Sequence, residues 1–167
     1  VDLFSRKSQR DLFIASLKYC IKEKGLNVYA YCMMTNHIHL IVNCNEPHQL
    51  RDTIRDLKKF TAKAAIQEII NGKESRREWL IELYKKEGEL DPKNKTYKVW
   101  QSGNHAIELY SEKFTWDKIH YIHRNPVEAG FVKYPDQWLY SSACNYAEKD
   151  ELILEEVICI TQRLITV

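Results

Sequence analysis

The stretch MMTNHIHLIV, residues 33–42, places two histidines inside an otherwise apolar run. The residues on both sides of its middle are mostly β-branched, aromatic or small and apolar, which favours strands. We therefore predict one strand over 27–34 and a second over 36–44, joined as a hairpin at Thr35 and Asn36. The rest of the chain is interpreted outward from this hairpin.

The two histidines, His37 and His39, are two residues apart, so they lie on the same face of the second strand together with Ile41. Two neutral imidazoles aimed at one point suit a divalent metal. A pair of ligands is too few for a closed structural site, but it is enough for an open catalytic site completed by another side chain, water and substrate oxygens. The alternative is that both histidines are hydrogen-bonded in the sheet or simply exposed.

Helical patterns lie on both sides of the hairpin. The first runs over 8–24 and stops before Gly25, and the second runs over 48–71 and is closed by Gly72. We further predict a polar elaboration with a short helix over 73–96, a strand at 97–101, and a helix from Ser111 that Pro126 halts.

The predicted helix at 48–71 carries a one-sided basic band beside its apolar stripe. Such a band can follow a phosphodiester backbone. The aromatic residues Tyr84, Trp100, Trp116 and Trp138 could offer stacking platforms for unpaired bases, although a solvated basic face and core aromatics are the alternative. The candidate DNA-binding residues are Arg51, Arg55, Lys58, Lys59 and Lys63.

A second group of candidate site residues lies on the late helix. Asp117, Tyr121 and Asn125 are spaced i, i+4 and i+8, so they share one face. A tyrosine hydroxyl is a poor nucleophile in water, but it can attack a phosphorus whose developing charge a metal compensates. The alternative is a core tyrosine on an amphipathic helix.

Composition limits the class of protein. A chain of 167 residues with net charge +2 predicts a single domain over 1–167, with a short C-terminal extension from about 148. Neither a run of about 18 apolar residues nor a leader pattern occurs, so we expect no membrane partner and a cytoplasmic protein. The five cysteines include no CxxC pair, which predicts reduced thiols that mostly fill the core.

Two signatures resemble those of a known family. YAYCMMTNHIHLIV at 29–42 is similar to the histidine-motif strand of the REP-associated tyrosine transposases, relatives of the single-strand insertion-sequence transposases in the HUH nuclease superfamily. YIHRNPVEAGFV at 121–132, followed by WLYSS at 138–142, resembles their second signature. LKKFTAKA at 57–64 and VWQ at 99–101 also follow the family order, so the resemblance covers nearly the whole chain.

The resemblance implies an α+β fold: a ferredoxin-like sandwich with a central antiparallel sheet and helices on its faces. Relatives usually open with a strand of the form aromatic-Val-Thr-x-Thr-Val, and the present sequence begins after that point. We therefore expect either a sheet that lacks this first strand or a sheet that is completed otherwise.

The resemblance also implies a function. His37 and His39 match the family's metal ligands, Tyr121 matches its nucleophile, and Asn125 stands where related enzymes place a third metal ligand. The implied enzyme uses Mg²⁺ or Mn²⁺ and cuts single-stranded DNA at hairpins or palindromic repeats, leaving a 5′-phosphotyrosine link and a free 3′-hydroxyl. It would be nucleoid-associated, and whether each active site needs one chain or a homodimer is left open.

Two other functions remain open from the sequence. One is a domesticated DNA-binding protein that keeps the fold but no longer cuts. The other is a zinc hydrolase that uses His37, His39 and His105 and forms no covalent DNA adduct.

Overall fold

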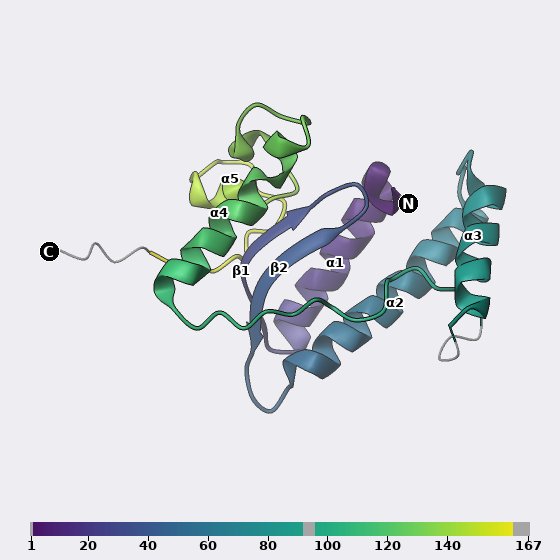
Figure 1. The fold of residues 1–167 in the computed structure, drawn as a ribbon, viewed down its shortest axis with the longest axis horizontal. Coiled ribbons are helices and arrows are strands. Elements are labelled where there is room, and N and C mark those ends of the chain that lie inside the picture. Colours follow the sequence, from purple (N-terminus) through teal and green to yellow (C-terminus); the bar gives the residue numbers. More distant parts are fainter. Residues whose placement is uncertain (1, 92–95, 162–167) are drawn as a thin grey trace, which may run out of the picture. The chain divides into compact units, whose positions relative to one another are not determined.

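The structure is a computed structural model that describes residues 2–91 and 96–161 (Figure 1). It divides into two compact units. We call the residues up to Thr53 together with those from Glu108 onward the hairpin unit, and Ile54–Ile107 the helical unit. Each unit is described by itself. Residues 92–95 of the predicted elaboration, and the last six residues of the C-terminal extension, lie outside the described residues.

The predicted hairpin is present. β1 (Leu26–Met33) pairs with β2 (Ile38–Cys44) in antiparallel register, with Cys32 opposite His39. The N–H of Met34 donates to the carbonyl of His37 at 2.9 Å, which closes the turn over the two predicted turn residues. His37 therefore lies in the turn, one residue before β2 begins, and not within the strand as predicted.

The other edge of β1 is covered by a segment from late in the chain. Met33 N–H donates to the Tyr140 carbonyl and Ser142 N–H donates to the Tyr31 carbonyl, both at 2.9 Å. Cys32 and Ser141 form an isolated antiparallel bridge at the same place. In the described residues the sheet thus has two strands, and the 140–142 segment takes the position where a further strand would pair with β1.

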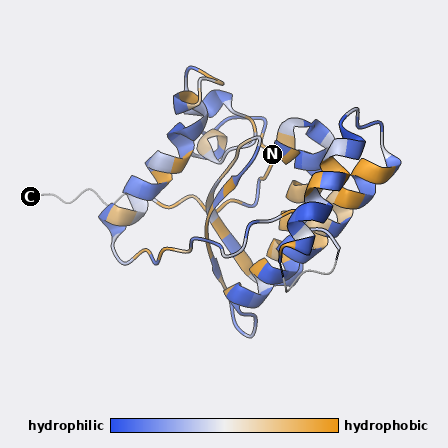
Figure 2. Ribbon diagram, turned by 45° about the vertical axis from the view of Figure 1, so that its right-hand side comes forward, coloured by the Kyte–Doolittle hydropathy of each residue, from blue (hydrophilic) through white to orange (hydrophobic). Residues whose placement is uncertain are grey.

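Two helices enclose the hairpin, α1 (Lys7–Glu23) and α4 (Glu112–Glu128), and both contact β1. Figures 1 and 2 show the strands between them. On the α4 side, alternate residues of β1 and the apolar stripe of α4 form a buried cluster, as the two periodicities require. Its members are Ala30, Cys32, Met34, Ile119 and Ile122. The predicted α+β class is confirmed, and the architecture is compatible with a transposase-type HUH fold that lacks a strand.

The start of α4 was predicted correctly and its end was not. The side-chain oxygen of Ser111 accepts a hydrogen bond from the Phe114 N–H at 3.2 Å and caps the helix. The helix continues past Pro126 to Glu128, because the proline lies in the last turn, where the Asn125 carbonyl still accepts the Ala129 N–H at 2.9 Å. Pro126 has no N–H to donate to the Ile122 carbonyl, so the helix loses one hydrogen bond there and ends two residues later.

Short helical segments complete the hairpin unit: η1 (Leu3–Ser5), η2 (Pro135–Gln137) and α5 (Ala143–Tyr146). From position 148 to 161 the chain has no helix or strand. Within this stretch the Ile158 N–H donates to the carbonyl of Val28 at 2.9 Å, so the C-terminal segment also reaches the edge of β1.

Most of α2 (Leu50–Asn71) belongs to the helical unit, together with α3 (Arg77–Glu89). Both helices were predicted. The prediction of a strand at 97–101 is wrong. Lys98 N–H donates to the Tyr84 carbonyl of α3 at 2.9 Å, so this segment packs against a helix and pairs with no strand of the described residues. It approaches α3 closely, since a Cβ on Gly88 would lie 2.8 Å from the Thr96 carbonyl oxygen.

Candidate active site

The two histidines of the motif are held next to each other at the tip of the hairpin. Their ring centroids are 4.8 Å apart, with His37 exposed and His39 half-buried. Nδ1 of His37 lies 2.6 Å from Oδ1 of Asn36. An amide oxygen can only accept a hydrogen bond, so Nδ1 carries the proton and Nε2 keeps its lone pair. Asn36 thereby fixes the tautomer of His37 that can bind a metal.

His39 presents a buried nitrogen that is not satisfied. Within the described residues Nε2 of His39 has no hydrogen-bond partner. Burial, with a further contribution from His37, lowers the pKa of His39, while the nearby Asn125 amide acts in the opposite direction. The imidazole is therefore neutral at neutral pH. A buried polar atom without a partner is costly, and a cation bound at the unprotonated nitrogen would remove that cost.

α4 places Tyr121 and Asn125 beside the histidines. The Tyr121 ring contacts the His39 ring edge-on at 5.7 Å between centroids, and its side chain is 52% exposed. Asn125 Nδ2 donates to the Tyr121 carbonyl at 2.9 Å, which orients the amide and leaves Oδ1 as an acceptor. The structure thus brings together all four residues that the sequence nominated for metal binding and nucleophilic attack.

Two other polar residues of α4 have different surroundings. Asp117 forms an ion pair with Lys113 at 2.9 Å on the exposed side of the helix. His123 is buried, with Nε2 2.7 Å from the Ser142 hydroxyl, and burial lowers its pKa to about 4. His123 is therefore a neutral core residue on the side of α4 that faces the 140–142 segment.

Two imidazole nitrogens and one amide oxygen form a set that could hold a divalent cation in an open site. The available atoms are Nε2 of His37, Nε2 of His39 and Oδ1 of Asn125, and water or phosphate oxygens would complete the shell. In the described residues no group of three or more histidine, cysteine, aspartate or glutamate side chains could hold a metal. The zinc hydrolase with His105 as a third ligand therefore finds no support.

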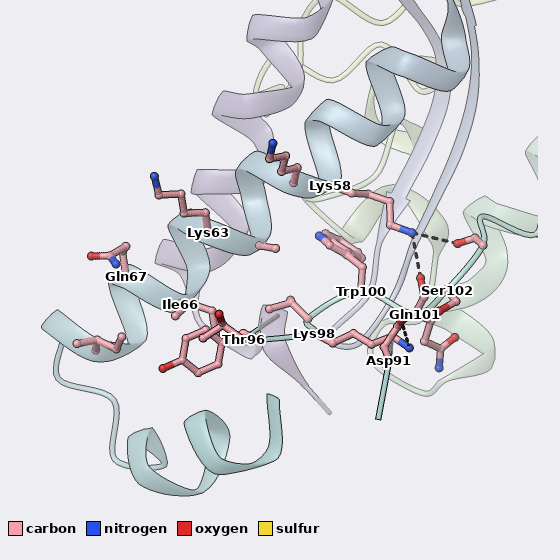
Figure 3. A pocket seen from close by; sticks show the side chains of 16 residues that line it. Lys58, Lys63, Ile66, Gln67, Asp91, Thr96, Lys98, Trp100, Gln101 and Ser102 are labelled. Atoms are coloured by element: carbon pink, nitrogen blue, oxygen red, sulfur yellow. Dashed lines mark hydrogen bonds and ion pairs between the residues drawn. The ribbon is translucent and has the colours of Figure 1, made fainter. Parts of the chain in front are cut away.

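The basic band is divided between the two units. Arg51 belongs to the hairpin unit, and the other four residues belong to the helical unit. There, α2 and the segment at 96–103 line a groove of about 630 Å³ that includes Trp100 (Figure 3). Lys59 and Lys63 are exposed at this groove, whereas Arg55 contacts the carboxylate of its neighbour Asp56 at 3.0 Å.

Lys58 has a different environment from the other basic residues. Its ammonium donates to the carbonyls of Gln101 and Gly103 and to Oδ1 of Asn104, at 3.0 to 3.1 Å. Figure 3 shows it reaching toward this segment, while Lys63 extends away from it. Burial lowers the Lys58 pKa. Lys58 therefore attaches the 101–104 segment to α2, and its charge is already engaged.

The α+β fold thus holds the two histidines of the hairpin beside a half-exposed tyrosine of α4. Residues 2–125 match the family described as Transposase IS200 like, and this range includes every candidate metal and nucleophile residue. The chain belongs to the IS200-like transposase family, whose members cleave and transfer DNA strands. No curated protein and no solved structure matches the chain.

Two further observations concern sequence and partners. The contribution of Asn36 was not predicted, although an asparagine directly before the histidine motif, in a tight turn, is a signal that could have been used.

None of the helices in the described part of the chain is long and apolar enough to cross a membrane.

Proposed function

We propose that this transposase is a metal-dependent, single-tyrosine endonuclease and strand-transferase of the REP-associated type. It acts on single-stranded DNA at hairpins or palindromic repeats. The observation that carries the proposal is the contact of the Tyr121 ring with His39, whose Nε2 is buried and unpaired. A core tyrosine would be buried, whereas half of this side chain is open to a substrate.

The residues present fit Mg²⁺ or Mn²⁺. His37, His39 and Asn125 would hold the cation, which when bound compensates charge on the scissile phosphate. Tyr121 supplies the nucleophilic oxygen: the Tyr121 Oη–phosphorus bond forms as the bond from phosphorus to the 3′-oxygen breaks. The tyrosine proton passes to solvent, and the leaving 3′-oxygen takes up a proton from solvent to become a 3′-hydroxyl. The 5′-phosphotyrosine link conserves the bond energy for rejoining.

Binding of folded DNA needs cationic surface outside the active site. Three exposed members of the basic band, Arg51, Lys59 and Lys63, supply it, and their positions on α2 suit contacts to a phosphate backbone; Arg55 is exposed too but contacts Asp56. Lys58 contributes to DNA binding indirectly, because its hydrogen bonds hold the 101–104 segment against α2. The non-cleaving DNA-binding alternative is not favoured, because the tyrosine and the histidine pair are assembled against each other.

Adduct formation tests this function. The protein is incubated with labelled single-stranded hairpins from its own genomic flanks and Mn²⁺, and denaturing electrophoresis detects a covalent protein–DNA band. We expect the band to disappear with chelator, with His37→Ala and with Tyr121→Phe. The matched control is Tyr19→Phe, an exposed tyrosine on α1 that should leave the band unchanged. An undiminished band in Tyr121→Phe would refute the proposed nucleophile.

A further inference from the structure

A row of side chains leads along the exposed side of α4 to the nucleophile. The Tyr110 ring stacks on the Phe114 ring at 5.0 Å between centroids, with the ring planes 21° apart. The Lys118 ammonium lies 5.2 Å from the Phe114 centroid and 5.7 Å from the Tyr121 centroid. We call Tyr110, Phe114 and Lys118 the α4 row.

The α4 row is not part of a core. Tyr110 is 81% exposed, and Phe114 and Lys118 are only half-buried. In the described part of the chain no carboxylate pairs with Lys118, and the neighbouring carboxylate of Asp117 is neutralised by Lys113. The row therefore presents the exposed ring of Tyr110 and, beside Tyr121, a lysine ammonium with no carboxylate partner in the described residues, while the Phe114 ring contacts both Tyr110 and Lys118.

These features match the chemistry of unpaired nucleotides. Every base has a flat face that stacks on aromatic rings, and every linkage carries a negative charge that a lysine can contact. From Phe114 to Tyr121 the helix rises about 10 Å at 1.5 Å per residue, which is the length of roughly three stacked nucleotides. A paired duplex hides its base faces, so the row would favour single strands.

We propose that the α4 row binds the unpaired nucleotides that adjoin the scissile phosphate. A base stacks on the exposed Tyr110 ring, which Phe114 supports by stacking against it, and Lys118 contacts the phosphate next to the one that Tyr121 attacks. This inference rests on the proposed function and assigns a substrate-binding surface to that same site. The alternative partner for this surface is a second copy of the chain. An apolar dimer contact would not need the Lys118 ammonium beside the nucleophile, whereas a DNA phosphate would.

The test measures DNA binding in the presence of chelator, so that no cleavage contributes. Fluorescence anisotropy compares a labelled hairpin that carries six unpaired flanking nucleotides with the same hairpin without them. Tyr110→Ala and Phe114→Ala should each weaken binding of the flanked hairpin about tenfold and leave the bare hairpin unchanged. Lys118→Ala should also lower the salt dependence of flanked binding by about one phosphate contact.

Two exposed residues on α1 provide matched controls, Tyr19→Ala and Lys22→Ala, which should bind both hairpins as the parent protein does. Because Tyr110 is highly exposed and lies outside the helix, Tyr110→Ala tests the row without risk to folding. Equal losses on both hairpins, or no loss on the flanked one, would overturn the proposal. A change from dimer to monomer with unchanged flanked binding would instead assign the row to a second copy.

The result is separable from the proposed function. Flank-dependent binding without any covalent adduct would retain the α4 row and refute cleavage. An adduct that forms normally in all three row variants, with flanked binding unchanged, would retain cleavage and refute the row.

Discussion

A single hydrogen bond, from His37 to Asn36, orients the imidazole that we propose as a metal ligand. Asn36 holds the Nδ1 proton, and without it the imidazole could adopt either tautomer and rotate in the exposed turn. Residues that orient a ligand in this way contribute strongly to metal affinity although they never touch the metal.

Asn36→Ala should therefore lower the affinity of the protein for Mn²⁺ by tenfold or more, within the 10- to about 100-fold range typical of such partners. Titration calorimetry without DNA measures this directly. Asn71→Ala, at the exposed end of α2, is the matched control and should bind Mn²⁺ normally. Equal affinities for the parent and Asn36→Ala would show that the turn asparagine does not orient His37.

Elements that depend on local pattern were predictable, and elements that depend on distant partners were not. Alternating apolar residues and two turn residues define the hairpin, and the helix periodicity locates α1, α2 and α4 within a few residues. The segment at 97–101 has strand-like composition, yet its backbone donates a hydrogen bond to Tyr84 within α3. Composition alone cannot distinguish these two outcomes, because a strand exists only if another strand pairs with it.

The contact between α1 and the 140–142 segment also depends on distant residues. The Tyr140 hydroxyl donates to Oδ1 of Asp11 at 2.7 Å. Two hydrogen bonds lower the pKa of the Asp11 carboxyl: the one from Lys7 has the larger effect, and the one from Tyr140 the next largest. A carboxyl with a lowered folded-state pKa stabilises the fold above its ordinary pKa, and the stabilisation is lost as pH falls through the lowered value.

Tyr140→Phe should reduce the free energy of unfolding by about 1 kcal/mol at pH 7, a modest value because Asp11 is largely solvated. Urea denaturation at several pH values measures the difference between parent and variant. It should be constant above about pH 5 and shrink as Asp11 is protonated below its ordinary pKa near 3.9. A difference that persists unchanged at pH 2 would mean that the stabilisation from the Tyr140 hydroxyl does not depend on the charge of Asp11.

At the scale of the molecule, the candidate chemistry and the groove belong to different units. All the proposed metal and nucleophile residues are in the hairpin unit, and the sequence indicated them through short motifs with fixed spacing. The groove depends on how the 96–103 segment packs on α2, which no motif specifies. The role of Lys58 as an attachment point within it could therefore not be predicted, even though its position in the basic band was clear.

Lys58→Ala should release the 101–104 segment and reduce stability by roughly 1–2 kcal/mol, because three hydrogen bonds of a partly exposed ammonium are lost. Hydrogen exchange should accelerate at 97–104, while Mn²⁺ affinity stays unchanged. Lys63→Ala, a matched exposed lysine on the same helix, should weaken DNA binding without faster exchange. Unchanged exchange in Lys58→Ala would contradict the attachment role.

The segment that covers the edge of β1 has a consequence during synthesis of the chain. Residues 140–142 emerge from the ribosome about a hundred residues after the strand that they protect. Until then β1 exposes a row of unpaired backbone groups, which can template pairing with other chains. The hairpin that carries the histidines can thus pair with other chains until residues 140–142 arrive, and this late segment protects the edge of β1 as well as completing the structure.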